Sequence, residues 1–127
     1  MNPDKLSHPY ELYYLNGLNL ETAFSVHTYY EILFVLNGDL DINTPDGVYH
    51  STGSVLVMIP PGAIHCNVLT SDSASYTRYV FFFTEKFCEK ISDMDVLLTS
   101  FRNGLTIYKM DVGQQKMLTD TFEKLHR

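Results

Sequence analysis

The sequence predicts a mainly β domain, a small barrel or sandwich of about seven or eight strands, followed by one or two helices. Two observations carry this prediction. Short runs rich in Tyr, Phe, Val and Ile alternate with turn-forming residues up to residue 84, and helical spacing of apolar residues replaces them after it. At 127 residues, the chain has the length of about one domain.

The expected strands are residues 10–15, 23–36, 39–42, 48–51, 54–59, 65–70 and 76–84. The turns between them have recognisable chemistry. Asn37-Gly38 supplies the positive φ of a tight hairpin, TPDG at 44–47 is a turn sequence, and SDSAS at 71–75 is a polar loop. Many short strands at spacings of about ten residues favour a closed or two-layered β structure.

Two helical segments are expected after the strands, at 85–91 and 111–127. We divide the chain into an N-terminal arm with the first strand (about 1–20), a barrel (21–84) and a helical tail (85–127), all within one domain. The apolar stripe of the last helix still runs at Leu125, and neither Gly nor Pro follows it. We therefore expect the natural protein to continue beyond Arg127.

Charge and composition exclude some functions. A formal net charge of −6 and an isoelectric point near 5.2 argue against a nucleic-acid-binding surface. The chain shows no signal peptide and no apolar run of the ~18 residues that a membrane span needs. We expect a cytoplasmic protein in which Cys66 and Cys88 are free thiols.

The strand expected at 23–36 carries ionisable groups in an otherwise apolar run. Because alternate residues of a strand share a face, one face should carry Ser25, His27, Tyr29, Glu31 and Leu33, and the other Tyr30, Ile32, Phe34 and Leu36. In a barrel, the first set would look into the interior. A second polar group, His65, follows the turn Pro60-Pro61-Gly62.

These residues resemble the two motifs of the cupin superfamily, G-x5-H-x-H-x3-4-E-x6-G and G-x5-P-x-G-x2-H-x3-N. His27, Glu31 and Gly38 match the first motif, and Gly53, Pro60, Gly62 and His65 match the second with one extra residue before the proline. Ser25 replaces the first histidine and Leu69 replaces the asparagine. The resemblance implies a double-stranded β-helix, or jelly-roll barrel.

A narrower resemblance covers nearly the whole chain. The order HTYYEILFVLNGDLDI, GSVLVMIPPGAIH, RYVFFFTEKF and a helical tail is similar to the N-terminal regulatory domain of AraC-type transcription regulators. It implies a non-enzymatic bacterial domain that binds a small effector, such as a sugar, inside the barrel. It also implies a homodimer formed through the tail, and DNA binding by a C-terminal domain that this chain does not contain.

The expected effector-binding residues are Ser25, His27, Tyr29, Glu31, His65 and Arg78. Alternatives remain for two of them, because Tyr29 could merely fill the barrel floor and Arg78 could point outward into solvent. We expect no cofactor. The alternative is one divalent metal ion, iron, manganese or zinc, on His27, Glu31 and His65, which would suit a stand-alone cupin isomerase or dioxygenase.

The helical tail also has two interpretations. Met117, Leu118, Phe122 and Leu125 form the apolar stripe of the last helix. This stripe could pair with its copy in a second subunit or fold back on the barrel. Because the barrel is already rich in core residues, the sequence favours the dimer.

Overall fold

The structure, a computed structural model, describes residues 6, 8–17, 24–70, 76–89, 98–99, 101 and 104–126. Two antiparallel sheets are built from these residues. The five-stranded sheet has the order β1 (Tyr10–Asn16), β7 (Thr77–Phe83), β2 (Tyr30–Asn37), β5 (Val55–Ile59) and β8 (Thr106–Lys109). The three-stranded sheet has the order β4 (Gly47–Ser51), β3 (Leu40–Thr44) and β6 (Cys66–Leu69). Two helices are α1 (Glu85–Cys88) and α3 (Val112–His126).

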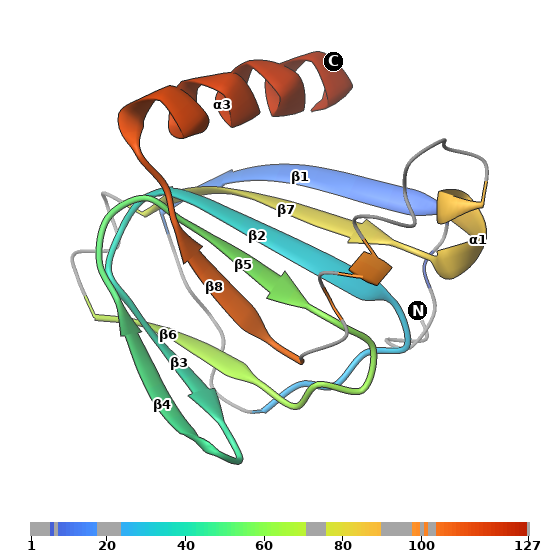
Figure 1. Cartoon of the computed structure of the whole chain (residues 1–127), viewed down its shortest axis with the longest axis horizontal. Helices are drawn as coiled ribbons and strands as arrows, with labels where there is room; N and C mark the ends of the chain where they lie inside the picture. The colour runs from blue at the N-terminus through green and yellow to red at the C-terminus, as the bar shows by residue number, and fades with distance from the viewer. Residues whose placement is uncertain are drawn as a thin grey trace.

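The five-stranded sheet curves over the three-stranded sheet (Figure 1). Apolar side chains from both sheets pack between them. The inner core consists of Leu33, Val35, Leu40, Ile42, Val55, Val57, Ile59 and Tyr76, each at most 3% exposed. Leu40 and Ile42 come from β3, and the other strand residues of this set come from β2 and β5. The result is a mainly β barrel of two antiparallel sheets with a C-terminal helix, as the sequence predicts.

The strands at the centre of the large sheet are buried on both faces. Leu33 and Val35 of β2 belong to the inner core, whereas Ile32 and Phe34 belong to a second core on the outer face, with Met58, Tyr79 and Phe83. The three consecutive phenylalanines of β7 alternate in the same way, since Phe82 lines an interior cavity while Phe81 and Phe83 pack in the outer core. A sheet buried on both sides explains the nearly continuous apolar sequence of β2.

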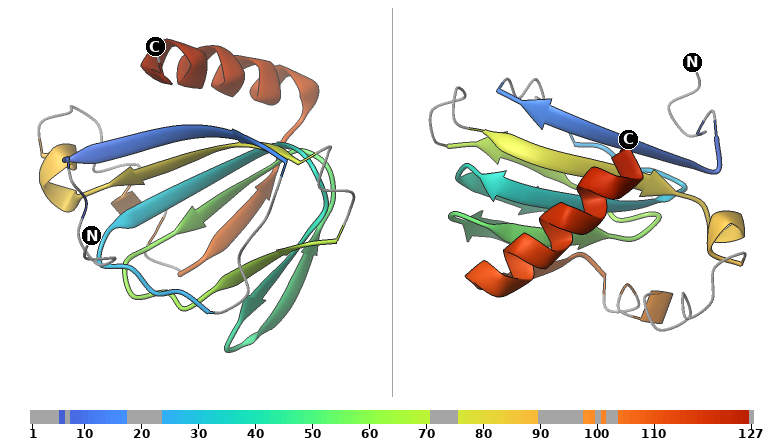
Figure 2. Two further views of the ribbon diagram at one scale, coloured as in Figure 1. Left: turned by 180° about the vertical axis from the view of Figure 1, so that it is seen from behind. Right: turned by 90° about the horizontal axis from the view of Figure 1, so that it is seen from above.

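Helix α3 covers the outer face of this sheet and crosses its strands obliquely (Figure 2). It begins in a capping box: the Gln114 backbone N–H donates to Asp111 Oδ1 (2.8 Å), and Gln114 Oε1 accepts from the Asp111 N–H (3.1 Å). Phe122 is 6% exposed, with its ring centroid 5.6 Å from that of Phe34 and 5.4 Å from that of Tyr79. The helix therefore folds back on its own barrel.

Three element predictions need correction. The strand expected from residue 23 begins at Tyr30, because residues 24–29 bend at Thr28 and Tyr29 and pair only through a bridge between Ser25 and His65. Strand β8 was not predicted, since four residues with no alternation give no pattern. Helix α1 ends at Cys88, earlier than expected; residues 90–91 and the loop 71–75 lie outside the described residues.

Of the arm expected at about 1–20, the structure describes residues 6 and 8–17. Most of these residues form β1. Cys66 and Cys88 are both buried, and neither forms a disulfide in the described part of the chain. Burial, reinforced by Glu85, raises the pKa of the Cys88 thiol above its ordinary value. In the described part of the chain, no helix is long and apolar enough to cross a membrane.

Gly38 offers a test of how tightly the turn after β2 is packed. Its φ is +131°, and a Cβ there would lie 2.8 Å from Cδ1 of the buried Tyr76 ring. Backbone strain and overpacking together predict that Gly38→Ala lowers the free energy of unfolding by about 2 kcal/mol or more. Gly53→Ala is the control, because φ is +72° there and no atom lies within 4 Å of the added Cβ. Equal losses in urea denaturation of the two variants would contradict the predicted clash.

Candidate functional site

The candidate site is a cavity of about 250 Å³ inside the barrel. It lies against the inner faces of β1, β7 and β2, and β6 and the segment before β2 complete its wall. Its lining consists of Tyr13, Leu15, Ser25, His27, Glu31, Leu33, His65, Asn67, Tyr76, Arg78, Val80 and Phe82. Five of the six predicted effector-binding residues are in this set. The sixth, Tyr29, is not.

Three ionisable side chains meet at one end of the cavity. Glu31 is 6% exposed, and its Oε1 lies 3.8 Å from Nε2 of His27 and 3.7 Å from Nε2 of His65. Antiparallel backbone bonds between Ser25 and His65 (2.7 and 3.0 Å) and a bond from the Gly62 N–H to the His27 carbonyl (2.9 Å) hold the two histidine segments together. Local sequence places Glu31, and these long-range bonds bring the imidazoles to it.

The orientation of His65 is set by the backbone. Its Nδ1 lies 2.9 Å from the Ala63 carbonyl oxygen, which can only accept, so Nδ1 carries a proton. Nε2 is then the atom that faces Glu31. In a neutral imidazole this atom is a lone-pair donor, suited to a metal ion or to a hydrogen-bond donor on a ligand.

The donor set fits a divalent metal ion in composition. The ligand atoms of His27, Glu31 and His65 all lie within 4.8 Å of one another. Atoms that share an ion at bond lengths of about 2.1 Å and tetrahedral or octahedral angles are about 3.0–3.4 Å apart, so side-chain shifts of less than about 1 Å would close the site. Imidazole and carboxylate ligands suit zinc, iron or manganese. The resembled motif has a histidine at the position of Ser25, which would be a fourth ligand. Its replacement by serine reduces the set to His27, Glu31 and His65.

Arg78 occupies another part of the cavity wall and is 9% exposed, so the interpretation that it points into solvent is wrong. Its Nη1 donates to the Gly17 carbonyl (2.6 Å) and to the Tyr76 carbonyl (3.4 Å), and its Cζ lies 3.9 Å from the centroid of the Tyr76 ring. Burial lowers the pKa of Arg78 below its ordinary value, and Tyr76 opposes that change. Arg78 shares a face of β7 with Val80 and Phe82, and this is the face that lines the cavity.

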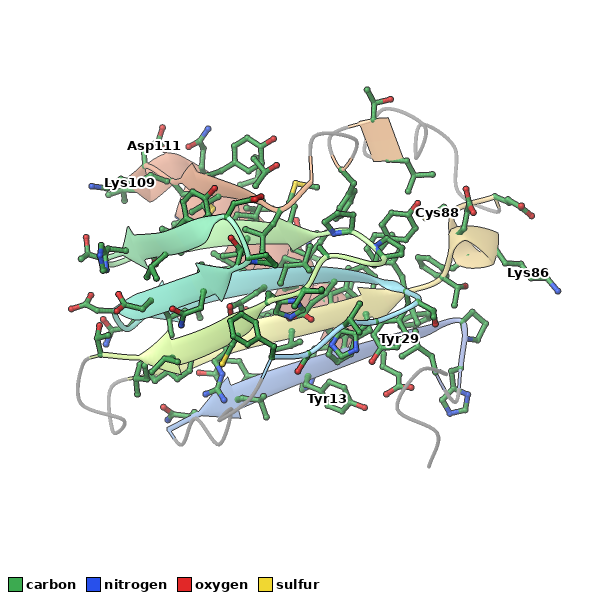
Figure 3. The ribbon with its side chains drawn as sticks, turned by 90° about the horizontal axis from the view of Figure 1, so that it is seen from below. Tyr13, Tyr29, Lys86, Cys88, Lys109 and Asp111 are labelled. Atoms are coloured by element: carbon green, nitrogen blue, oxygen red, sulfur yellow. The ribbon has the colours of Figure 1, made fainter. Side chains whose placement is uncertain are left out.

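Tyr29 supports the site from behind. Its ring stacks on that of His27, with centroids 4.8 Å apart, and meets Phe82 edge-on at 5.2 Å. Tyr13 reaches the same Phe82 ring from β1 at 6.2 Å, and Figure 3 shows Tyr13 and Tyr29 on the same side of the sheet. The bend at residues 28–29 breaks the expected alternation, so Tyr29 orients His27 without lining the cavity.

Sequence reasoning missed four polar or aromatic lining residues: Tyr13, Asn67, Tyr76 and Phe82. Alternation carries the signal for all four. In the strand expected at 76–84, Tyr76 and Phe82 share a face with Arg78; on β1, Tyr13 shares a face with Leu15; and Asn67 follows His65 by two residues.

The four residues expected at a dimer contact are divided between two environments. Phe122 is buried against its own sheet and Leu118 packs at the edge of the same core, so these two serve intramolecular packing. Met117 and Leu125 are 62% and 52% exposed. The apolar stripe thus mainly secures α3 to the barrel, and of the four residues only Met117 and Leu125 are exposed.

Comparison with solved structures shows which known proteins have a similar fold. The apo K231A variant of ToxT from Vibrio cholerae strain SCE256 matches over 93% of this chain and 48% of its own, with a TM-score of 0.62 at 11% identity. Wild-type ToxT with a bound unsaturated fatty acid matches over 90% and 45%, with a TM-score of 0.60 at 13% identity. No protein-family model and no curated protein sequence matches the chain.

ToxT is a regulator of the AraC family, and this chain has the fold of its N-terminal region. The predicted likeness is thereby confirmed at the level of the fold. The chain spans about half the length of ToxT, with 48% of that chain covered.

Proposed function

We propose that this chain is the effector-binding domain of an AraC-type transcription regulator. The observation that carries the proposal is the partly enclosed cavity, in which Ser25, His27, Glu31, His65 and Arg78 converge from different segments, and whose other lining residues, except Asn67, are aliphatic or aromatic. A few polar groups in an apolar lining are the usual composition of a specific small-molecule site. The fold shared with a regulator supports this proposal over an unrelated barrel function.

Strand β1 offers a route from the cavity to the tail. Its inner residues Tyr13 and Leu15 line the cavity, whereas Leu12 packs in the outer core beneath α3. A more open hollow of about 560 Å³ lies between β1 and the end of α3, with Leu125 on its wall. A ligand that prefers one arrangement of β1 would shift α3 and the DNA-binding domain that we expect after it.

Effector binding should depend on Glu31. In Glu31→Gln the side chain keeps its size but loses its charge, so a charge-assisted bond weakens and affinity falls about ten- to a hundredfold. A thermal-shift screen of small metabolites, followed by calorimetry, measures this effect. Asp120→Asn removes an exposed carboxylate from α3 and should leave affinity unchanged. A ligand that binds both variants like the wild type would place the effector site elsewhere.

The proposal includes a homodimer formed through α3. Met117 and Leu125 are large apolar side chains exposed on this helix, and they supply its contact surface. Leu125→Glu should raise the dimer dissociation constant about tenfold or more, because it places a charge in an apolar contact. Sedimentation equilibrium measures the change, with the neighbouring exposed Lys124→Glu as the control. If both variants sediment as the wild type does, α3 is not the dimer contact.

A second candidate function is a metal-dependent cupin enzyme, an isomerase or dioxygenase. The approach of His27, Glu31 and His65 within 4.8 Å favours it. If it holds, purified protein retains about one equivalent of zinc, iron or manganese, and His65→Ala loses it. Elemental analysis of both proteins decides the question. Effector binding by protein that has been stripped of metal with a chelator would reject this candidate.

A further inference from the structure

The cavity wall is chemically ordered along the strands. Strands β2 and β7 pair in a register that stacks three inward-facing rungs. The rungs are Glu31 with Phe82, Leu33 with Val80, and Val35 with Arg78. Because residues on the same face of a strand repeat every ~6.6 Å, the first and third rungs are about 13 Å apart at the backbone. The cavity thus has an acidic end, an apolar middle and a basic end.

The acidic end is the cluster already described. Glu31 accepts hydrogen bonds when it is ionised, and the Nε2 atoms of His27 and His65 lie 3.8 and 3.7 Å from it. A ligand hydroxyl or amino group that enters this space would find acceptors on the carboxylate and on a neutral imidazole. This end therefore selects a hydrogen-bond donor.

The basic end is anchored by backbone and ring contacts. Arg78 donates to the backbone carbonyls of Gly17 and Tyr76, and its guanidinium lies over the Tyr76 ring. These contacts orient the planar guanidinium at the cavity wall, and burial disfavours its charged form, as the lowered pKa of Arg78 records. Guanidinium groups bind carboxylates with paired, charge-assisted hydrogen bonds.

The middle of the cavity limits what can join the two ends. Leu33 and Val80 form the central rung, and β1 adds Tyr13 beside Val80 and Leu15 beside Arg78. The volume of about 250 Å³ equals roughly eight molecules of liquid water at ~30 Å³ each. One ring or a short carbon chain fits this space. A sugar would set its hydroxyl groups against the apolar rung.

We propose that the cavity takes a compact carboxylic acid whose acid group lies at Arg78 and whose far end carries a hydroxyl or amino group that donates to Glu31. This inference rests on the proposed function and names the class of effector. It assigns Arg78 to recognition of the anion and Glu31 to recognition of the donor. The apolar rung between them sets the length of the ligand.

The test compares ligands that differ at one end only. The probes are 4-hydroxybenzoate and 6-hydroxyhexanoate, each with its uncharged amide and with the acid that lacks the hydroxyl. In calorimetry on the wild type, at least one hydroxy acid should bind about tenfold or more tightly than its amide and than its deoxy counterpart. Arg78→Gln should abolish the preference for the acid over its amide. Glu31→Gln should abolish the preference for the hydroxy acid over the acid that lacks the hydroxyl. Ratios measured within one variant cancel any general effect on folding.

Lys109→Gln, which removes an exposed cation, and Asp120→Asn, which removes an exposed anion, are the matched controls and should keep both preferences. Amides that bind as tightly as acids in the wild type would overturn the inference, as would failure of every hydroxy acid to bind. In either case, a neutral compound from the metabolite screen that loses affinity in Glu31→Gln would leave the proposed effector-binding function standing. If the wild type binds neither the hydroxy acids nor any compound from the metabolite screen, both this inference and the proposed effector-binding function are rejected.

Discussion

A carboxylate buried in an apolar strand is the constraint on which the site depends. Glu31 is 6% exposed and is followed along β2 by residues of the two cores. A charge in such surroundings is unfavourable unless polar groups come to it. His27 and His65 do so from segments far apart in sequence, which the Ser25–His65 bridge joins. The backbone bonds that shape this end of the barrel thus also assemble its chemistry.

The large sheet serves as a wall with two occupied faces. On β7, Arg78 faces the cavity, and the next residue, Tyr79, stacks against Phe122 of α3. Closely packed side chains transmit displacement because no void absorbs it. Under the proposed function, a ligand that moves the inner face would also displace the helix on the outer face, across the thickness of one sheet. This arrangement suits a domain that reports on a bound molecule.

The likeness to ToxT at 11% identity illustrates what a fold requires and what it leaves open. Barrels of this kind need alternating buried faces and turns at the right positions, and many sequences meet those needs. A few cavity side chains carry the chemistry, and the fold does not dictate them. The ligand must therefore be inferred from Glu31, Arg78 and the apolar rung between them.

The sequence by itself determined the β class, the last helix and the polar character of the strand around Glu31, because alternation, turn residues and helical spacing are local properties. Only the tertiary structure decided that β2 begins at Tyr30, that Arg78 turns inward and that Asn67 joins the cavity. Alternation groups residues on one face of a strand but does not say which face lines the cavity, and the bend before β2 goes with a bridge between Ser25 and the distant His65. The stripe around Phe122 likewise showed that one face of the last helix is apolar, and packing alone showed that its own barrel covers Phe122.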